Sequence, residues 1–278
     1  MIQNADDNEY TIAERNGGHP YLRFNVHDDR IEVESNEDGF KEQDVRSICS
    51  TALSTKRESG VHIGEKGIGF KSVFKVAKKV HILSGPYSFF LSYNPNLENG
   101  GLDMVIPRQA KHKELPDSVR TRITLYLHNP DRIEELVQEL SNLPDTPLLF
   151  LRKLSTIEIN LRHSNNEINI QLEHIDDGER LGEHPKEGIL KTYRVNKKEK
   201  VETKWFWVFR NRATELPSDP LREGNDSAPI ALAFPVNGKD EPVIAEQEVY
   251  AFLPVRKANF TVSICYILQY SSAWLAVE

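Results

Sequence analysis

The sequence predicts an α+β protein made of two modules. Helix-like and strand-like segments alternate up to about residue 150, and mainly strand-like segments follow, a pattern typical of two packed modules in one chain. The 278 residues suffice for one large or two moderate domains, and for a core without disulfide or metal staples. We place the modules at residues 1–160 and 161–278.

Composition excludes several classes of protein. The 35 Lys and Arg residues against 42 Asp and Glu give a net charge of −7, which argues against a nucleic-acid or anionic-membrane partner. The two cysteines, Cys49 and Cys265, cannot form a disulfide framework or a four-ligand zinc site. No signal peptide and no run of 18 apolar residues is visible, so we expect an intracellular protein, cytoplasmic or nuclear.

The first module begins with a predicted hairpin. Residues 21–26 and 30–34 alternate apolar and polar side chains, and the turn residues His27-Asp28-Asp29 separate them. A short helix is predicted near 41–50, followed by a loop. Phe70, Val73, Phe74 and Ala77 recur at helical spacing, which predicts an amphipathic helix over 70–79.

Strand-like runs dominate the rest of the chain. One further helix is predicted after Asn129-Pro130, where apolar residues recur at helical spacing from Ile133 to Leu140. The predicted strands are 80–83, 87–93, 102–106, 121–127, 155–161, 167–172, 190–195, 201–210, 230–236 and 248–254. The charged segments 173–187 and 212–228 are rich in Gly, Pro and Asp and are predicted to be loops.

The most informative segment is Gly64-Glu-Lys-Gly-Ile-Gly-Phe-Lys-Ser72. It has the pattern G-x-x-G-x-G directly before the predicted helix. Glycines allow close backbone approach, and a helix N-terminus favours anions, so the segment suits a polyphosphate. It matches neither the Rossmann fingerprint nor the P-loop, and a glycine-rich helix entry without a ligand remains an equal alternative on this segment alone.

Three more segments accompany the glycine run. Asn4-Ala-Asp-Asp7-Asn8 lies at the start, Asn36-Glu-Asp-Gly39-Phe40 follows the hairpin, and Thr121 begins a later strand. In this order the segments resemble the GHKL superfamily of ATPases (gyrase, heat-shock chaperone, histidine kinase, MutL), and within it the group that includes NO VEIN and sacsin. The resemblance covers about residues 1–127. It implies a Bergerat-type two-layer α/β sandwich with a mixed, largely antiparallel sheet, followed by a β-rich module that begins a transducer-like domain.

The resemblance also implies roles for individual residues. Asn4 would coordinate a Mg²⁺ ion that bridges the phosphates of ATP, and Asp7 would face the ribose and adenine. Lys56 would lie in a lid over the nucleotide, and Thr121 would hydrogen-bond toward adenine. The implied nucleotide site comprises Asn4, Asp7, Asn36, Gly39, Phe40, Lys56, Gly64, Lys66, Gly67, Ile68, Gly69, Phe70 and Thr121. The resemblance implies ATP and Mg²⁺ as cofactors, and it is compatible with protein partners or clients.

The sequence departs from the family pattern at two points of the site. The glutamate that would act as general base lies four residues before the motif asparagine, and four before Asn4 is position 0. We therefore expect hydrolysis only where that glutamate is restored. The alternatives are a non-hydrolysing nucleotide sensor or scaffold, or a truncated product without ATP binding. In the adenine motif Asp-x-Gly-x-Gly, Ser35 takes the first position and Glu37 the middle one, which leaves base selectivity open.

Two other clusters have simpler explanations. Lys71, Lys75, Lys78 and Lys79 could form a nucleic-acid-binding face, but a solvated helix face fits the acidic balance better. The run Trp205-Phe206-Trp207 resembles a base-stacking platform, but we expect a strand buried on both faces. No His, Cys and Asp cluster has the spacing of a metal site.

Overall fold

The computed structural model describes most of the chain, in two compact units. The described residues are 1–49, 70–94, 104, 106–130, 133–163, 166–195, 198–215, 227–244, 247–251, 253–258 and 263–266. The first unit comprises Met1–Leu143, Lys153–Gln171 and Tyr193–Lys200, and the second comprises Pro144–Arg152, Leu172–Thr192 and Val201–Glu278. The predicted boundary at residue 160 stays a prediction.

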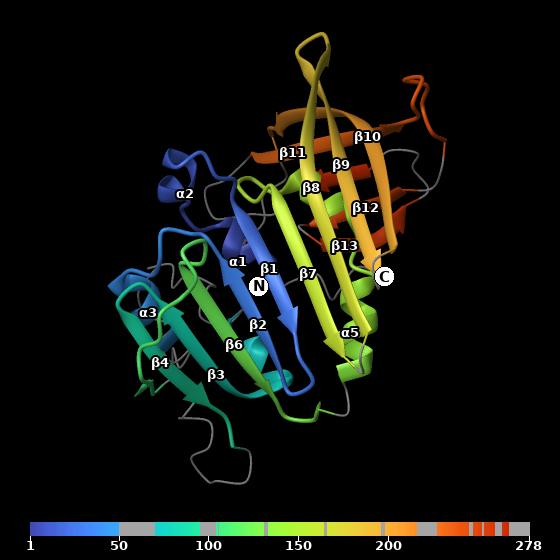
Figure 1. Cartoon of the computed structure of the whole chain (residues 1–278). Coiled ribbons are helices and arrows are strands. Elements are labelled where there is room, and N and C mark those ends of the chain that lie inside the picture. Colours follow the sequence, from blue (N-terminus) through green and yellow to red (C-terminus); the bar gives the residue numbers. More distant parts are fainter. Residues whose placement is uncertain are drawn as a thin grey trace. The chain divides into compact units, whose positions relative to one another are not determined.

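The first unit is built on a mixed sheet. Its strands are β1 (Tyr21–Val26), β2 (Arg30–Ser35), β3 (Ala77–Ser84), β4 (Tyr87–Ser92), β5 (Arg108–Gln109), β6 (Thr121–Leu127) and β7 (Thr156–His163). The strand order is β7-β1-β2-β6-β3-β4-β5 (Figure 1). β1 is parallel to β7, and the other neighbours are antiparallel. The predicted hairpin is confirmed, because β1 and β2 pair from Leu22↔Ser35 to Val26↔Ile31.

The helices of the first unit are short. They are α1 (Ile2–Asp6), α2 (Thr11–Arg15), α3 (Glu42–Cys49), the 3₁₀ helix η1 (Ser72–Lys75) and α5 (Ile133–Ser141). The helices predicted near 41–50 and after Asn129-Pro130 are confirmed by α3 and α5. No helix among the described residues has the length and apolar character needed to cross a lipid bilayer.

The second unit contains longer strands. They are β8 (Asn166–Leu181), β9 (His184–Val195), β10 (Lys198–Ala213), β11 (Ala228–Val236), β12 (Gln247–Ala251), β13 (Leu253–Ala258) and β14 (Ser263–Tyr266), with β8 to β10 beginning or ending in the first unit. Their order is β13-β12-β14-β11-β10-β9-β8. The 3₁₀ helix η4 (Thr146–Phe150) also belongs to this unit, and its Leu148, Leu149 and Phe150 are buried.

The predicted fold class is wrong. We expected a two-layer α/β sandwich with a β-rich second module, but the strands of the described residues join in one large mixed sheet. The α-helices with described bounds have only five to nine residues. The segment 173–187, predicted to be a loop, lies mostly in β8 and β9. Its charges misled the prediction, because a strand with one accessible face tolerates charged side chains on that face.

The helix predicted over 70–79 is also wrong in its second half. The helical conformation ends with η1 at Lys75, and β3 begins at Ala77. β3 pairs with β4 on one side and β6 on the other. Hydrogen bonds to two neighbouring strands therefore outweigh the helical spacing of the apolar side chains in this segment.

A buried carboxylate fastens α1 to the strand layer. Asp6 is fully buried, and its Oδ1 accepts hydrogen bonds from the backbone N–H groups of Lys153 (2.8 Å) and Leu154 (3.1 Å), just before β7. The Tyr10 hydroxyl donates to the Ala5 carbonyl oxygen (2.9 Å) in the same region. These bonds hold α1 in place, and α1 carries Asn4.

We predict that Asp6→Ala destabilises the protein. Two buried backbone donors lose their acceptor, which should lower the free energy of unfolding by about 2–4 kcal/mol. Asp6→Asn keeps an oxygen acceptor and should cost less. Urea denaturation measures both, with Asp28→Ala in the exposed β1–β2 turn as the control. Equal stability of Asp6→Ala and Asp28→Ala would contradict the role of Asp6.

Candidate functional site

A cavity of about 90 Å³ opens in the first unit beside the β2–β6 pair. Residues from segments far apart in the sequence line it, from α1 and the residues beside it, β1, β2, the segment after β2, α3, Phe70 before η1, and β6. The apolar lining comprises Met1, Ala5, Leu22, Val33, Phe40, Ile48, Phe70 and Ile123, and the polar lining comprises Asn4, Asn8, Ser35, Glu37, Asp44, Ser47 and Thr121. The walls are mainly apolar, and a few polar groups converge between them, which is typical of a small-molecule site.

The register of β2 and β6 decides which side chains reach this cavity. Val33 pairs with Ile123, and Ser35 pairs with Thr121. Since side chains alternate between the faces of a sheet, these four lie on the cavity face. Arg122, between Thr121 and Ile123, lies on the opposite face, where its guanidinium binds Glu34 (2.6 Å).

Glu37 is the chemically unusual group of the cavity. It is only 2% exposed, and among the described residues its Oε1 has no hydrogen-bond partner. The Asn8 side-chain amide donates to Oε2, and the nearby Thr121 hydroxyl favours the ionised form of the carboxyl group. A buried polar atom without a partner is costly unless a ligand or water satisfies it. Oε1 is thus an acceptor available to a ligand.

A chain of hydrogen bonds orients Thr121 toward Glu37. The Phe40 backbone N–H donates to Ser84 Oγ (2.8 Å), and Ser84 Oγ lies 2.6 Å from Thr121 Oγ1. The chain joins β3, β6 and the segment after β2 around one carboxyl group.

Burial raises the pKa of Glu37 to about 7. The neighbouring charges of Asp44 and Asp38 act in the same direction, while the hydrogen bonds from Thr121 and Asn8 favour the ionised form and oppose it. Near neutral pH the carboxyl group therefore exchanges readily between its protonated and ionised forms. It can donate a hydrogen bond to a ligand in one form and accept one in the other.

Four of the predicted site residues come together here. Asn4, Phe40, Phe70 and Thr121 all line the cavity, although they are widely separated in the sequence. Gly39 lies directly before Phe40 with a φ of 92°, which a glycine adopts without strain, and a Cβ there would contact Ser84 Oγ at 3.6 Å.

The other predicted residues lie elsewhere or outside the described residues. Asn36 fastens the start of β1, because its Oδ1 accepts from Tyr21 N–H (2.9 Å) and its Nδ2 donates to the His19 carbonyl (2.9 Å). Asp7 caps α1 at its C-terminal end and is not among the lining residues. Lys56, Gly64, Lys66, Gly67, Ile68 and Gly69 lie outside the described residues.

Sequence reasoning missed five polar residues of the cavity, Asn8, Ser35, Glu37, Asp44 and Ser47, and the chemically important pair among them is Glu37 and Asn8. Both lie within segments that were singled out, but a glutamate in a charged turn sequence usually indicates exposure. The usable signal was its position in the adenine motif, where it replaces a glycine. Ser84, which orients Thr121, has no signal in the sequence.

Comparison with known proteins gives one distant relative. No family model matches the chain. The chain is similar to Protein NO VEIN of Arabidopsis thaliana, with 28% identity over 288 residues that cover 97% of this chain and 10% of the relative. The chain spans about a tenth of the length of this curated relative. The similarity supports a NO VEIN-like relationship, and the wider GHKL relationship stays a prediction.

We predict that Glu37→Gln changes how stability depends on pH. The folded pKa of about 7 lies above the unfolded value of 4.5, so the stability of the folded state is complete below pH 4.5 and falls as the pH rises through 7. Because Gln does not ionise, the free energy of unfolding of Glu37→Gln relative to the wild type should increase from pH 5 to pH 8, by at most about 3 kcal/mol. Urea denaturation at four pH values measures it.

The exposed Glu42→Gln serves as the control for this series, since Glu42 lies on α3 with its side chain 70% exposed. Its curve should follow the wild-type curve at every pH. Parallel curves for Glu37→Gln and wild type would show that Glu37 does not titrate near neutrality.

Proposed function

We propose that the cavity of the first unit binds the adenine end of ATP, with Mg²⁺ at the phosphates. The observation that carries this proposal is the convergence of Asn4, Phe40, Phe70 and Thr121 around the unpartnered Oε1 of Glu37. Their four segments are those whose wording resembles a nucleotide-binding family. An accidental cavity would not be expected to select the same four segments.

The lining fits a purine with an exocyclic amino group. Leu22, Val33, Ile48 and Ile123 provide apolar surface for the faces and edge of a flat ring. The ionised Glu37 Oε1 accepts a hydrogen bond from an amino group such as that of adenine. Guanine carries a carbonyl oxygen at ring position 6, where adenine carries its amino group, so for a base that presents position 6 to the ionised Glu37, adenine is favoured over guanine.

The phosphates would meet groups from the glycine run and from α1. The backbone N–H groups of Gly64, Gly67 and Gly69 and the charge of Lys66 are suited to them, by the sequence argument. Among the described residues no group of three His, Cys, Asp or Glu side chains could hold a metal ion. Mg²⁺ commonly takes few protein ligands and several phosphate and water oxygens, so the Asn4 amide oxygen suffices as a protein ligand.

The similarity to Protein NO VEIN supports the proposal only in part. It extends over 97% of this chain. The name of this relative states no ligand. The proposal of nucleotide binding therefore rests on the cavity and the sequence motifs of this chain and not on the relative.

We predict that a non-hydrolysable ATP analogue with Mg²⁺ raises the unfolding temperature. At 100 times its dissociation constant, a ligand adds about 2.7 kcal/mol to the free energy of unfolding. The corresponding GTP analogue should give a smaller shift at the same concentration. Differential scanning calorimetry measures both, and no shift with millimolar ATP analogue would refute the proposal.

We predict that Thr121→Val weakens binding of the ATP analogue by about tenfold, because it removes a hydroxyl at the base and releases the orientation of Glu37. Thr124→Val is the matched control. Thr124 is a buried threonine of the same strand, but it lines the opposite face of the sheet. Isothermal titration calorimetry compares the two variants. Equal losses in both would indicate a general effect on β6, and equal retention would remove Thr121 from the site.

A further inference from the structure

The sheet of the second unit carries an aromatic face. We give this name to the surface formed by Trp205, Trp207 and Phe209 of β10 and Phe234 of β11. Trp207 pairs with Phe234 in the antiparallel register, so both point to the same side. The rings of Phe209 and Phe234 meet edge to face with centroids 5.2 Å apart. The three β10 side chains are half-buried and Phe234 is 38% exposed.

The other face of these strands forms the core. Phe206 and Val208 of β10 and Ala233 of β11 alternate with the aromatic face and are buried. The prediction that Trp205–Trp207 is buried on both faces is therefore wrong. Four large aromatic side chains that remain partly accessible on one face of a sheet are typical of a binding surface.

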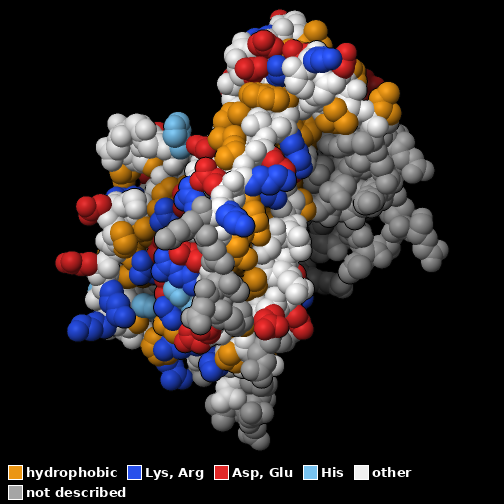
Figure 2. Space-filling view, turned by 45° about the vertical axis from the view of Figure 1, so that its right-hand side comes forward, with side chains coloured by type: hydrophobic (Ala, Val, Ile, Leu, Met, Phe, Trp, Pro, Cys, Tyr) orange, Lys and Arg blue, Asp and Glu red, His pale blue; other side chains and the backbone are white. Residues whose placement is uncertain are grey.

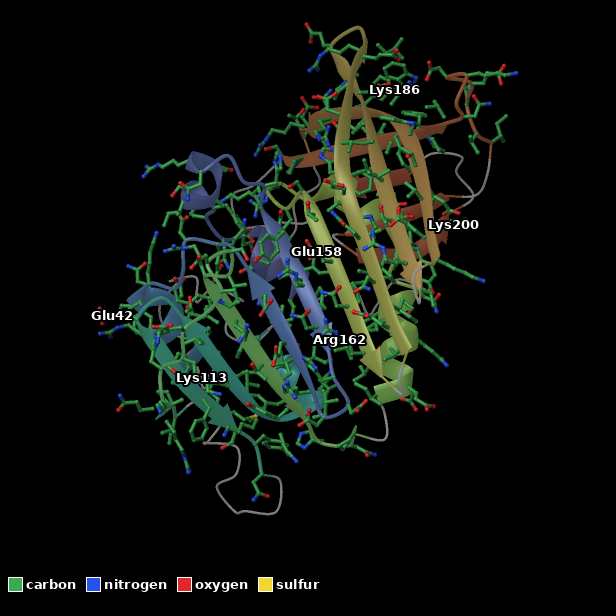
Figure 3. All side chains as sticks on the ribbon, in the orientation of Figure 1. Glu42, Lys113, Glu158, Arg162, Lys186 and Lys200 are labelled. Atoms are coloured by element: carbon green, nitrogen blue, oxygen red, sulfur yellow. The ribbon has the colours of Figure 1, made fainter. Side chains whose placement is uncertain are left out.

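A lysine lies at the edge of this face and is held by three carboxylates. Lys186 lies on β9 (Figure 3). Its Nζ lies 2.8 Å from Asp177, 3.1 Å from Glu179 and 2.7 Å from Asp240. The same nitrogen lies 5.3 Å from the ring centroid of Trp205 and 6.0 Å from that of Trp207. The site thus already accommodates one cation against tryptophan rings.

The surrounding backbone is shaped to hold this arrangement. Gly188 of β9 lies under Trp205, and a Cβ there would come within 2.7 Å of the indole ring. Asp240 has a φ of 62°, in a turn where the Asn237 side-chain oxygen accepts from Lys239 N–H (2.8 Å) and Glu241 N–H (3.1 Å). The turn places the Asp240 carboxylate on Lys186.

Charge indicates what kind of partner this surface accepts. Three carboxylates around one ammonium leave a net charge of about −2. The side chains remain partly exposed, at 32% for Asp177, 56% for Glu179 and 44% for Asp240, so each can also bind a group from outside. Tryptophan rings attract cations through their electron-rich faces. Figure 2 shows acidic (Asp or Glu), basic (Lys or Arg) and hydrophobic side chains mixed over the region of β8 and β9.

The same charge argues against other occupants. A second copy would bring an equally acidic surface against this one, and the whole chain carries a net charge of −7. Nucleic acids and anionic lipid surfaces are repelled for the same reason. A protein segment that combines cationic and apolar side chains satisfies both the carboxylates and the aromatic rings.

We propose that the aromatic face and the three carboxylates beside it bind a segment of another protein that carries Lys or Arg next to aliphatic or aromatic residues. Its cationic groups contact the outer oxygens of Asp177, Glu179 and Asp240. Its apolar side chains cover Phe209 and Phe234. This proposal is independent of nucleotide binding in the first unit.

The test uses two fluorescein-labelled synthetic peptides of alternating Arg and Leu or Glu and Leu. By fluorescence anisotropy with the full chain, the Arg peptide should bind at least about tenfold more tightly than the Glu peptide. Its affinity should fall, but not vanish, when salt rises from 50 to 500 mM. Equal binding of the two peptides, or no binding of either, would overturn the proposal.

Two variants locate the binding. Phe234→Ser removes an exposed ring, and Glu179→Gln removes one exposed charge. Each substitution should weaken binding of the Arg peptide at least about threefold. The control Glu42→Gln removes an exposed charge from the first unit and should leave binding unchanged. Equal weakening by the control would show non-specific attraction to an acidic protein. Concentration-dependent dimers that Phe234→Ser abolishes would assign the surface to a second copy instead, and overturn the proposal.

Discussion

The pairing of β2 with β6 is the constraint on which the first unit depends. Glu34, only 4% exposed, is bound by Arg122 from β6, with Arg122 Nε 2.7 Å from Glu34 Oε1, and by Asn25 Nδ2 of β1 at 3.1 Å. A slip of one residue would exchange the two faces of the strand and leave this carboxylate buried without its cation. The same register that pairs Glu34 therefore also directs Ser35 and Thr121 into the cavity.

The buried carboxylate of the cavity, Glu37, and that of the opposite face, Glu34, have different kinds of partner. Glu34 is neutralised by arginines, whereas Glu37 receives hydrogen bonds from neutral groups alone, Asn8 and Thr121. Burial without a cation is what raises the pKa of Glu37. Burying the ionised Glu37 carboxylate therefore lowers the free energy of unfolding. A ligand that donates an amino hydrogen bond to Glu37 would reduce this loss. Such a cost is typical of binding sites.

Local patterns predicted much of the first unit and less of the second. The β1–β2 hairpin follows from alternation around His27-Asp28-Asp29, and the motif order predicted that Asn4 and Thr121 share a site. The helix prediction over 70–79 failed because β3 forms through its pairing with two neighbouring strands, β4 and β6. The loop prediction for the segment 173–187 failed because its charges are paired across neighbouring strands, Asp177 of β8 with Lys186 of β9 and Glu187 of β9 with Arg210 of β10. Such pairs leave no local periodic signal.

Lys186 offsets the electrostatic repulsion among the three carboxylates beside the aromatic face. Asp177, Glu179 and Asp240 would repel one another if they stood alone beside the two tryptophans, and one ammonium group removes most of that repulsion. A purely structural cluster would be expected to balance its charge, as Lys204 does with Asp145 in the same unit. Here two negative charges remain, next to rings that stay partly exposed. That imbalance distinguishes a surface that is stable alone from one that is also suited to a cationic partner.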